Sequence, residues 1–178
     1  MTRYAEASHD EWIAAQPSLV RSQFADLQHH IDANVHRKLQ LRILSQAADG
    51  AVHRYEQRVK LLGLRQRDVF ERRWTADGAL VDTSVEGFNQ GGSLTFRFVP
   101  EARGGVEGTR VAITVRLPLP PVVGPLLKPL LLVQVRKEVA AAAAEDKRDI
   151  ESGAFGAGAA ALQPSGAASG RAVLGAAA

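Results

Sequence analysis

The chain has 178 residues, of which 46% are hydrophobic and 23% are charged. This length and balance are typical of one globular domain with one core. Cysteine is absent, which excludes disulfides, thiolate-held iron–sulfur clusters, cysteine zinc sites and a thiol nucleophile. The net charge is +3, from 22 basic and 19 acidic residues. Because no basic stripe is interleaved with aromatic residues, nucleic acid is not an expected partner.

The composition also predicts where the chain resides and where its domain ends. Residues 1–4 begin no apolar segment of the secretory kind, so we expect a cytoplasmic protein. The most apolar stretch, residues 126–144, is interrupted by a proline and several charges, so no membrane span is expected. Residues 153–178 are poor in large side chains and carry a single charge, Arg171. We therefore expect one domain over residues 1–152 and a disordered tail rich in alanine and glycine over 153–178.

The first forty residues are expected to be mainly helical. Ser8 and Glu11 have the spacing of a capping box, which predicts a helix that begins there. A second helix is predicted to begin near Pro17, because apolar residues then follow at helical spacing. These residues are Val20, Phe24, Leu27 and Ile31.

Residues 39–117 alternate between apolar and polar side chains, which is the pattern of strands with one buried and one solvated face. Turn signals at residues 49–50, 77–78 and 90–92 separate these strands and predict an antiparallel meander. The apolar positions expected on the inner face are Leu41, Ile43, Tyr55, Val59, Phe96, Phe98, Ile113 and Val115.

A long helix is predicted after the strands. Residues 118–125 hold four of the eight prolines, and a helix follows them to about Ile150. Leu131, Val135 and Val139 form its apolar stripe, which continues into an unbroken alanine run over residues 140–144. Small side chains there either let the helix lie close to the sheet or leave a volume open beneath it.

A meander of long strands followed by one long helix resembles the START/Bet v 1-like superfamily, also called SRPBCC or helix-grip, which includes polyketide cyclase-like proteins. The features that carry the resemblance are the strands at 54–62 and 65–74, the strand end at 85–88, the hairpin over 94–119 and the segment 124–127. The resemblance implies an α+β fold in which a curved antiparallel sheet wraps around the C-terminal helix. Family members usually begin with a strand. Here the N-terminal segment is predicted to be helical, so that strand is either degenerate within residues 1–7 or missing.

The resemblance also implies a ligand cavity between sheet and helix, since relatives bind lipids, sterols, polyketides or aromatic molecules, and some are cyclases or hydrolases. The residues alone leave two alternatives, in which the inner face either lines such a cavity or fills a core. No nucleophile motif is present, so whether the chain is an enzyme stays open. The leading hypothesis is binding of an apolar small molecule without a cofactor. The expected ligand-binding residues are the eight inner-face positions together with Leu131, Val135 and Val139.

Three of the five histidines, His29, His30 and His36, lie close together. Two imidazoles and a carboxylate form a known iron-ligand set. The segment also resembles, more weakly, the iron-binding stretch of Rieske-type ring oxygenases. That resemblance implies an iron site formed by His29 or His30, His36 and either Asp146 or Asp149, with His30, His36 and Asp149 as the preferred set.

This alternative function, a degenerate iron oxygenase, has two faults. The spacing between the histidines is longer than in that family, and a Rieske centre needs cysteine. A structural role is the simpler hypothesis, in which the histidines cap a helix end or pair with Asp26 and Asp32. An acid–base role is a further alternative.

A third hypothesis is a protein partner, which predicts an exposed apolar patch around residues 118–132. Glu86 lies near a strand end and is expected on the exposed rim, because carboxylates are rarely buried without a partner.

Overall fold

The computed structural model describes residues 3–48, 51–61, 63–119 and 124–156. Within them, seven strands form one antiparallel sheet in the order β1-β7-β6-β5-β4-β3-β2. The elements are β1 Arg3–Ile13, α1 Pro17–Ala25, α2 Leu27–Asp32, β2 Gln40–Gln46, β3 Val52–Leu61, β4 Leu64–Trp74, β5 Leu80–Gly87, β6 Ser93–Pro100, β7 Thr109–Leu119 and α3 Gly124–Glu151.

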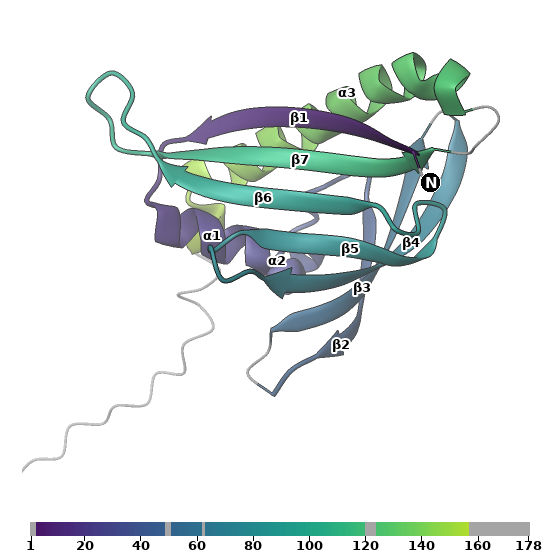
Figure 1. Ribbon diagram of the computed structural model, residues 1–178. Helices are drawn as coiled ribbons and strands as arrows, with labels where there is room; N and C mark the ends of the chain where they lie inside the picture. Colours follow the sequence, from purple (N-terminus) through teal and green to yellow (C-terminus); the bar gives the residue numbers. More distant parts are fainter. Residues whose placement is uncertain (1–2, 49–50, 62, 120–123, 157–178) are drawn as a thin grey trace, which may run out of the picture.

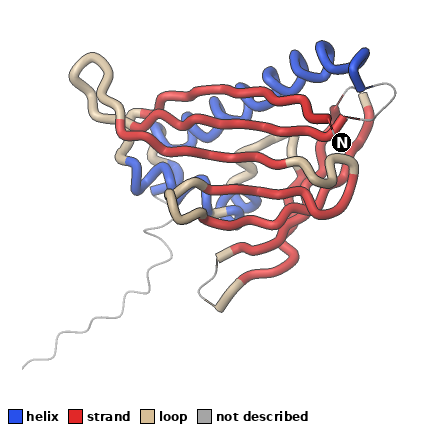
Figure 2. The backbone as a smooth tube through the Cα atoms, in the orientation of Figure 1, coloured by secondary structure: helices blue, strands red, loops and turns tan. Residues whose placement is uncertain are grey.

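The sheet curves, and all three helices lie on one side of it (Figures 1 and 2). From β2 to β7, each strand pairs with its neighbour in sequence, as expected for strands joined by tight turns. The long helix α3 runs along the sheet behind β1 and β7 (Figure 1). The predicted α+β helix-grip architecture is therefore confirmed.

The N-terminal prediction is wrong for residues 3–13. Instead of a helix that begins at Ser8 and Glu11, this segment is strand β1, which pairs with β7 along its whole length. Ala5, Ala7 and Ile13 are buried, whereas Glu6 and Ser8, which alternate with the two alanines, are exposed. This alternation is that of a strand with one buried face. The first strand expected from the family resemblance is therefore present.

The second predicted helix begins at Pro17, as expected. It ends at Ala25, because Asp26 leaves the helical conformation and caps the next helix, accepting a hydrogen bond from the amide of His29 at 2.9 Å. Such a cap satisfies an amide at the start of a helix that has no partner within the helix. The predicted apolar face is thus divided between α1 and α2.

Gly87 allows a close backbone approach where β4 meets β5. Its φ is +115°, and a Cβ at this position would lie 2.2 Å from the carbonyl oxygen of Arg67. Only glycine fits such a close backbone approach. The register of the two strands shifts nearby, between Val69 and Phe70, and an irregularity of this kind increases the local bend of a sheet.

The core lies between the sheet and the helices. From α3, Val135, Ala143 and Ile150 are buried in the main cluster, and Leu131 and Val139 pack against it half-buried. The predicted stripe of α3 therefore faces the sheet. Among the described residues, no helix is long and apolar enough to cross a membrane.

The folded part extends past residue 152. Residues 153–156 are described, and Phe155 is buried with its ring centroid 5.0 Å from that of His29. The remainder of the predicted tail, residues 157–178, lies outside the described residues.

Candidate functional site

Two adjoining cavities lie between α3 and the sheet. The first has a volume of about 150 Å³. The second has a volume of about 90 Å³. Apolar side chains dominate the wall of the first, which includes Val59, Phe70, Leu94, Val115, Leu117, Val135 and Val139. The cavities share part of their lining, namely Leu39, Gln57, Leu94, Val139 and Ala142.

The alanine run of α3 forms one wall of both cavities. Ala141 and Ala142 line the first, and Ala142 and Ala143 line the second. The sequence left open whether these alanines bring the helix close to the sheet or leave a volume beneath it. Along residues 141–143 they leave a volume that a larger side chain would occupy.

Most of the predicted ligand-binding residues line these cavities. Val59, Val115, Val135 and Val139 line the first, and Leu41, Tyr55, Phe96, Ile113 and Val139 line the second.

Three predicted residues line neither cavity. Ile43 packs against a core cluster formed by Leu27, Val52, Tyr55 and Phe70. Phe98 packs against Phe24 with ring centroids 5.5 Å apart, and Leu131 packs against the main core.

Lining residues that the sequence prediction missed include Leu39, Gln57, Phe70, Leu94 and Leu117. Leu94 and Leu117 belong to the same alternating pattern and could have been found from it.

The second cavity has a polar wall made by three neighbouring strands. Arg72 on β4 donates two hydrogen bonds to the carboxylate of Asp82 on β5, each at 2.7 Å, and Tyr55 on β3 donates a third at 2.9 Å. Arg72 also donates to the carbonyl of Phe24 at 2.9 Å, which links the sheet to α1. Burial and the negative charge of Asp82 raise the pKa of Tyr55 well above its ordinary value, so this hydroxyl stays protonated.

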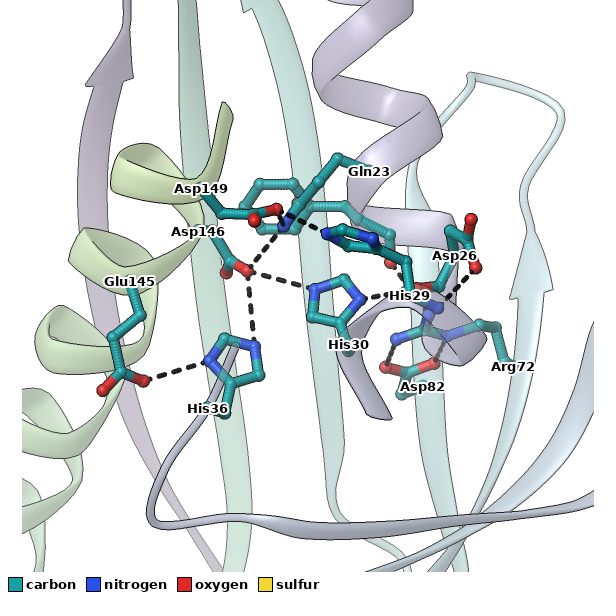
Figure 3. A network of polar contacts seen from close by, with 11 residues as sticks. Gln23, Asp26, His29, His30, His36, Arg72, Asp82, Glu145, Asp146 and Asp149 are labelled. Atoms are coloured by element: carbon teal, nitrogen blue, oxygen red, sulfur yellow. Dashed lines mark hydrogen bonds and ion pairs between the residues drawn. The ribbon is translucent and has the colours of Figure 1, made fainter. Parts of the chain in front are cut away.

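Beside this wall, two histidines converge on one carboxylate (Figure 3). The Nε2 atom of His30 lies 3.1 Å from Oδ1 of Asp146, and Nε2 of His36 lies 3.3 Å from the same oxygen. The three residues come from α2, the segment after it and α3. One potential ligand atom from each lies within 4.8 Å of those of the other two.

The preferred third ligand, Asp149, is not part of this group. Its carboxylate lies 2.9 Å from Nε2 of His29 instead. Asp146 and Asp149 are joined by Gln23, whose Nε2 donates to one carboxylate at 3.2 Å and to the other at 3.1 Å. Asp146, the alternative named with Asp149, is the carboxylate that faces His30 and His36.

The other ring nitrogens of the pair are held by oxygen atoms. Nδ1 of His30 lies 2.6 Å from the carbonyl oxygen of Asp26, to which it must donate. Nδ1 of His36 lies 3.2 Å from the Glu145 carboxylate. In each imidazole, Nδ1 is thus occupied by one oxygen atom, and Nε2 is the nitrogen that faces Asp146. Burial lowers the pKa of His30, but the hydrogen bond and charge of Asp146 outweigh this effect, so its pKa is raised.

Two other predicted features can be located. Glu86 is exposed and accepts a hydrogen bond from Arg67 at 2.7 Å, as expected for a rim position. Part of the predicted apolar patch, residues 120–123, lies outside the described residues. Within the predicted range, Leu130 on α3 is 57% exposed, and Val133 just beyond it is 64% exposed.

No protein-family model and no curated protein sequence matches the chain. Solved structures do match. The protein TTHA0849 from Thermus thermophilus is 22% identical with a TM-score of 0.67, over 83% of this chain and 97% of that one. A START superfamily protein from Mycobacterium smegmatis is 18% identical with a TM-score of 0.63, over 77% and 92%. A truncated norcoclaurine synthase from Thalictrum flavum is 14% identical with a TM-score of 0.64, over 84% and 94%.

These similarities establish the class of fold. Identities this low are informative about architecture alone, because one fold can carry many functions. The chain has the START/Bet v 1-like, or SRPBCC, helix-grip fold that the sequence resemblance predicted.

Proposed function

We propose that the chain binds a small apolar molecule, such as a lipid, a polyketide or an aromatic compound, in the two adjoining cavities between the sheet and α3. The observation that carries this proposal is the open volume beneath the alanine run of α3, walled by apolar side chains of β3, β4, β6 and β7. Concave, mainly apolar sites with a few polar groups are the usual sites for small molecules.

The structural neighbours support the proposal at the level of the fold. One of them, norcoclaurine synthase, has a structure in complex with dopamine and hydroxybenzaldehyde. Both compounds are small and aromatic, as the proposed ligand class allows. The buried polar groups of the second cavity, Tyr55, Arg72 and His30, would then face one end of a ligand that occupies both cavities.

A neutral fluorescent probe, N-phenyl-1-naphthylamine, tests the proposal, because its emission rises in an apolar site. We expect the wild-type protein to bind it saturably. Ala142→Phe should weaken binding at least about tenfold while leaving the melting temperature near that of the wild type, since the ring enters open space rather than a filled core. Ala140→Phe is the matched control, because Ala140 lines neither cavity. Absence of saturable binding, or an Ala142→Phe protein that binds normally, would refute the proposal.

We also infer a second candidate function, a metal centre formed by His30, His36 and Asp146. The donor set fits a divalent transition metal. Ligand atoms about 2.1 Å from one ion lie roughly 3.0–3.4 Å apart, and the two nitrogen–oxygen distances here are 3.1 and 3.3 Å. Hydrogen bonds from the opposite ring nitrogens to Asp26 and Glu145 would orient both imidazoles, as is usual around metal-binding histidines.

Iron bound there would be held by His30, His36 and Asp146, and would supply the oxygen chemistry typical of sites with two histidines and one carboxylate. The protein without a histidine tag should then retain near-stoichiometric iron. Added Co²⁺ should give a visible absorption band that His36→Ala abolishes. His29→Ala should keep the band, because His29 pairs with Asp149 instead. Protein that takes up neither metal would contradict the inference and favour a structural role for the histidines.

A further inference from the structure

A third recess, which we call the basic cleft, lies beside the first cavity and has a volume of about 480 Å³. It is formed by the segment before β2 and by the hairpin of β3 and β4. Among the described residues, no acidic side chain lines it, whereas six cationic residues do, namely Arg37, Lys38, Arg58, Lys60, Arg65 and Arg67. A concave surface lined by one sign of charge concentrates the electrostatic field and attracts counter-ions.

The hairpin places like charges directly opposite one another. In the register of β3 and β4, Arg58 pairs with Arg67, and Lys60 pairs with Arg65. Like charges at such positions destabilise a sheet. The first pair is compensated by the buried carboxylate of Glu56, which lies 2.9 Å from Arg58 and 2.6 Å from Arg67.

The second pair has no such compensation. Neither Lys60 nor Arg65 has an ion-pair partner within the described residues, and the same holds for Arg37. The free protein therefore keeps an uncompensated positive charge at the end of the hairpin that bounds the cavity. A bound anion would remove this repulsion.

The basic cleft adjoins the apolar cavity at the end of the hairpin. Lys38, Val59 and Gln66 line both of them. Gln66 is 6% exposed, and its amide oxygen is buried with no hydrogen-bond partner in the described part of the chain. A buried amide oxygen without a partner is costly, and it requires a hydrogen-bond donor. The junction between cleft and cavity thus offers an unused polar group.

We propose that the basic cleft binds the anionic group, a carboxylate or a phosphate, of an amphipathic molecule whose apolar part occupies the cavity beneath α3. The inference rests on the proposed function and narrows the ligand class to anionic amphiphiles. Lys60 and Arg65 supply the uncompensated charge. The amide oxygen of Gln66 can accept a hydrogen bond only from a donor on the ligand, such as a hydroxyl group, and not from the anionic group itself. Lys38 adds a further cation, which also donates a hydrogen bond to Glu138 at 3.4 Å.

Three probes with the same ten-carbon chain test the inference, namely decanoate, decyl phosphate and decan-1-ol, each measured by displacement of N-phenyl-1-naphthylamine. We expect at least one anionic probe to bind about ten times more tightly than the alcohol at low salt, with the difference shrinking as salt screens the cleft. The double variant Lys60→Gln/Arg65→Gln should lose most of this difference and bind decan-1-ol unchanged. Arg73→Gln/Arg136→Gln is the matched control, because both arginines are exposed and neither lines the cleft.

These measurements test the anionic site separately from apolar binding in the cavity. Equal affinity of all three probes in the wild type, or a preference for the anions that the Lys60→Gln/Arg65→Gln variant retains, would overturn the anionic site and leave apolar binding intact. Failure of N-phenyl-1-naphthylamine and all three probes to bind would overturn the proposed function, and the anionic site with it.

Discussion

Arg72 and Asp82 form an ion pair whose side chains are only 8% and 1% exposed. Arg72→Met would leave the Asp82 carboxylate buried with the Tyr55 hydroxyl as its remaining partner. Breaking one half of a buried pair typically costs about 3–5 kcal/mol, whereas Tyr55→Phe removes one hydrogen bond and should cost about 1–2 kcal/mol. Urea unfolding of the two variants measures both losses of stability, and we expect the loss to be larger for Arg72→Met. An Arg72→Met protein as stable as Tyr55→Phe would show that the pair does not hold the three strands together.

Glu56 makes a pH-dependent contribution to stability. The hydrogen bond from Arg67 lowers the pKa of Glu56, and outweighs the effect of burial, which raises it. A carboxylate with a lowered folded-state pKa contributes stability above its ordinary pKa, here 4.5, and that contribution is lost as the pH falls through the folded value. Between about pH 5 and about pH 3, the free energy of unfolding should therefore fall more steeply for the wild type than for Glu56→Gln. Chemical denaturation at each pH gives the free energy of unfolding of both proteins. If it falls equally with pH in the wild type and in Glu56→Gln, this role of Glu56 is contradicted.

The histidine cluster shows what residue chemistry alone can predict. His30 and His36 stand out in the sequence because two imidazoles near a carboxylate form a known metal-ligand set, and the structure brings both histidines to Asp146. The choice between Asp146 and Asp149 needed the rotation of α3 about its axis. These two positions are three residues apart and lie on the same broad face of a helix, so the apolar stripe could not separate them.

Among the elements, β1 was missed because its evidence is not local. The spacing of Ser8 and Glu11 suits a helix start, and the buried positions of the segment include the small residues Ala5 and Ala7, which carry little hydrophobic signal. The pairing with β7, more than ninety residues away in sequence, decides the conformation. Tertiary pairing of this kind overrides local preference.

Helix α3 offers a direct test of its predicted orientation. Val135 is 6% exposed, and Val135→Asp would bury a carboxylate without a partner, which should cost several kcal/mol and come close to unfolding a domain of ordinary stability. Val133→Asp is the matched control two residues away, where the side chain is exposed and the change should stay within about 0.5 kcal/mol. Thermal unfolding of both proteins gives the comparison. Equal stability would mean that α3 meets the sheet with another face.

For the whole molecule, the period-two pattern predicted which face of each strand is buried but not how that face is used. Val59 and Phe98 were indistinguishable in the sequence, yet Val59 lines the first cavity and Phe98 packs against Phe24. The difference depends on where each strand lies relative to α3, which alternation does not encode. The basic cleft escaped notice for a similar reason, since its cations come from separate segments that only the folded hairpin brings together.

Binding between the sheet and α3 is the claim on which the proposals about ligands depend, and the position of a bound probe decides it. Amide chemical shifts of ¹⁵N-labelled protein, followed during titration with N-phenyl-1-naphthylamine, report that position residue by residue. We predict that the signals of Val59, Leu94 and Ala142 move most, because these residues line the first cavity. Shifts confined to the exposed residues Leu130 and Val133, or no shifts at saturating probe, would contradict binding in the interior.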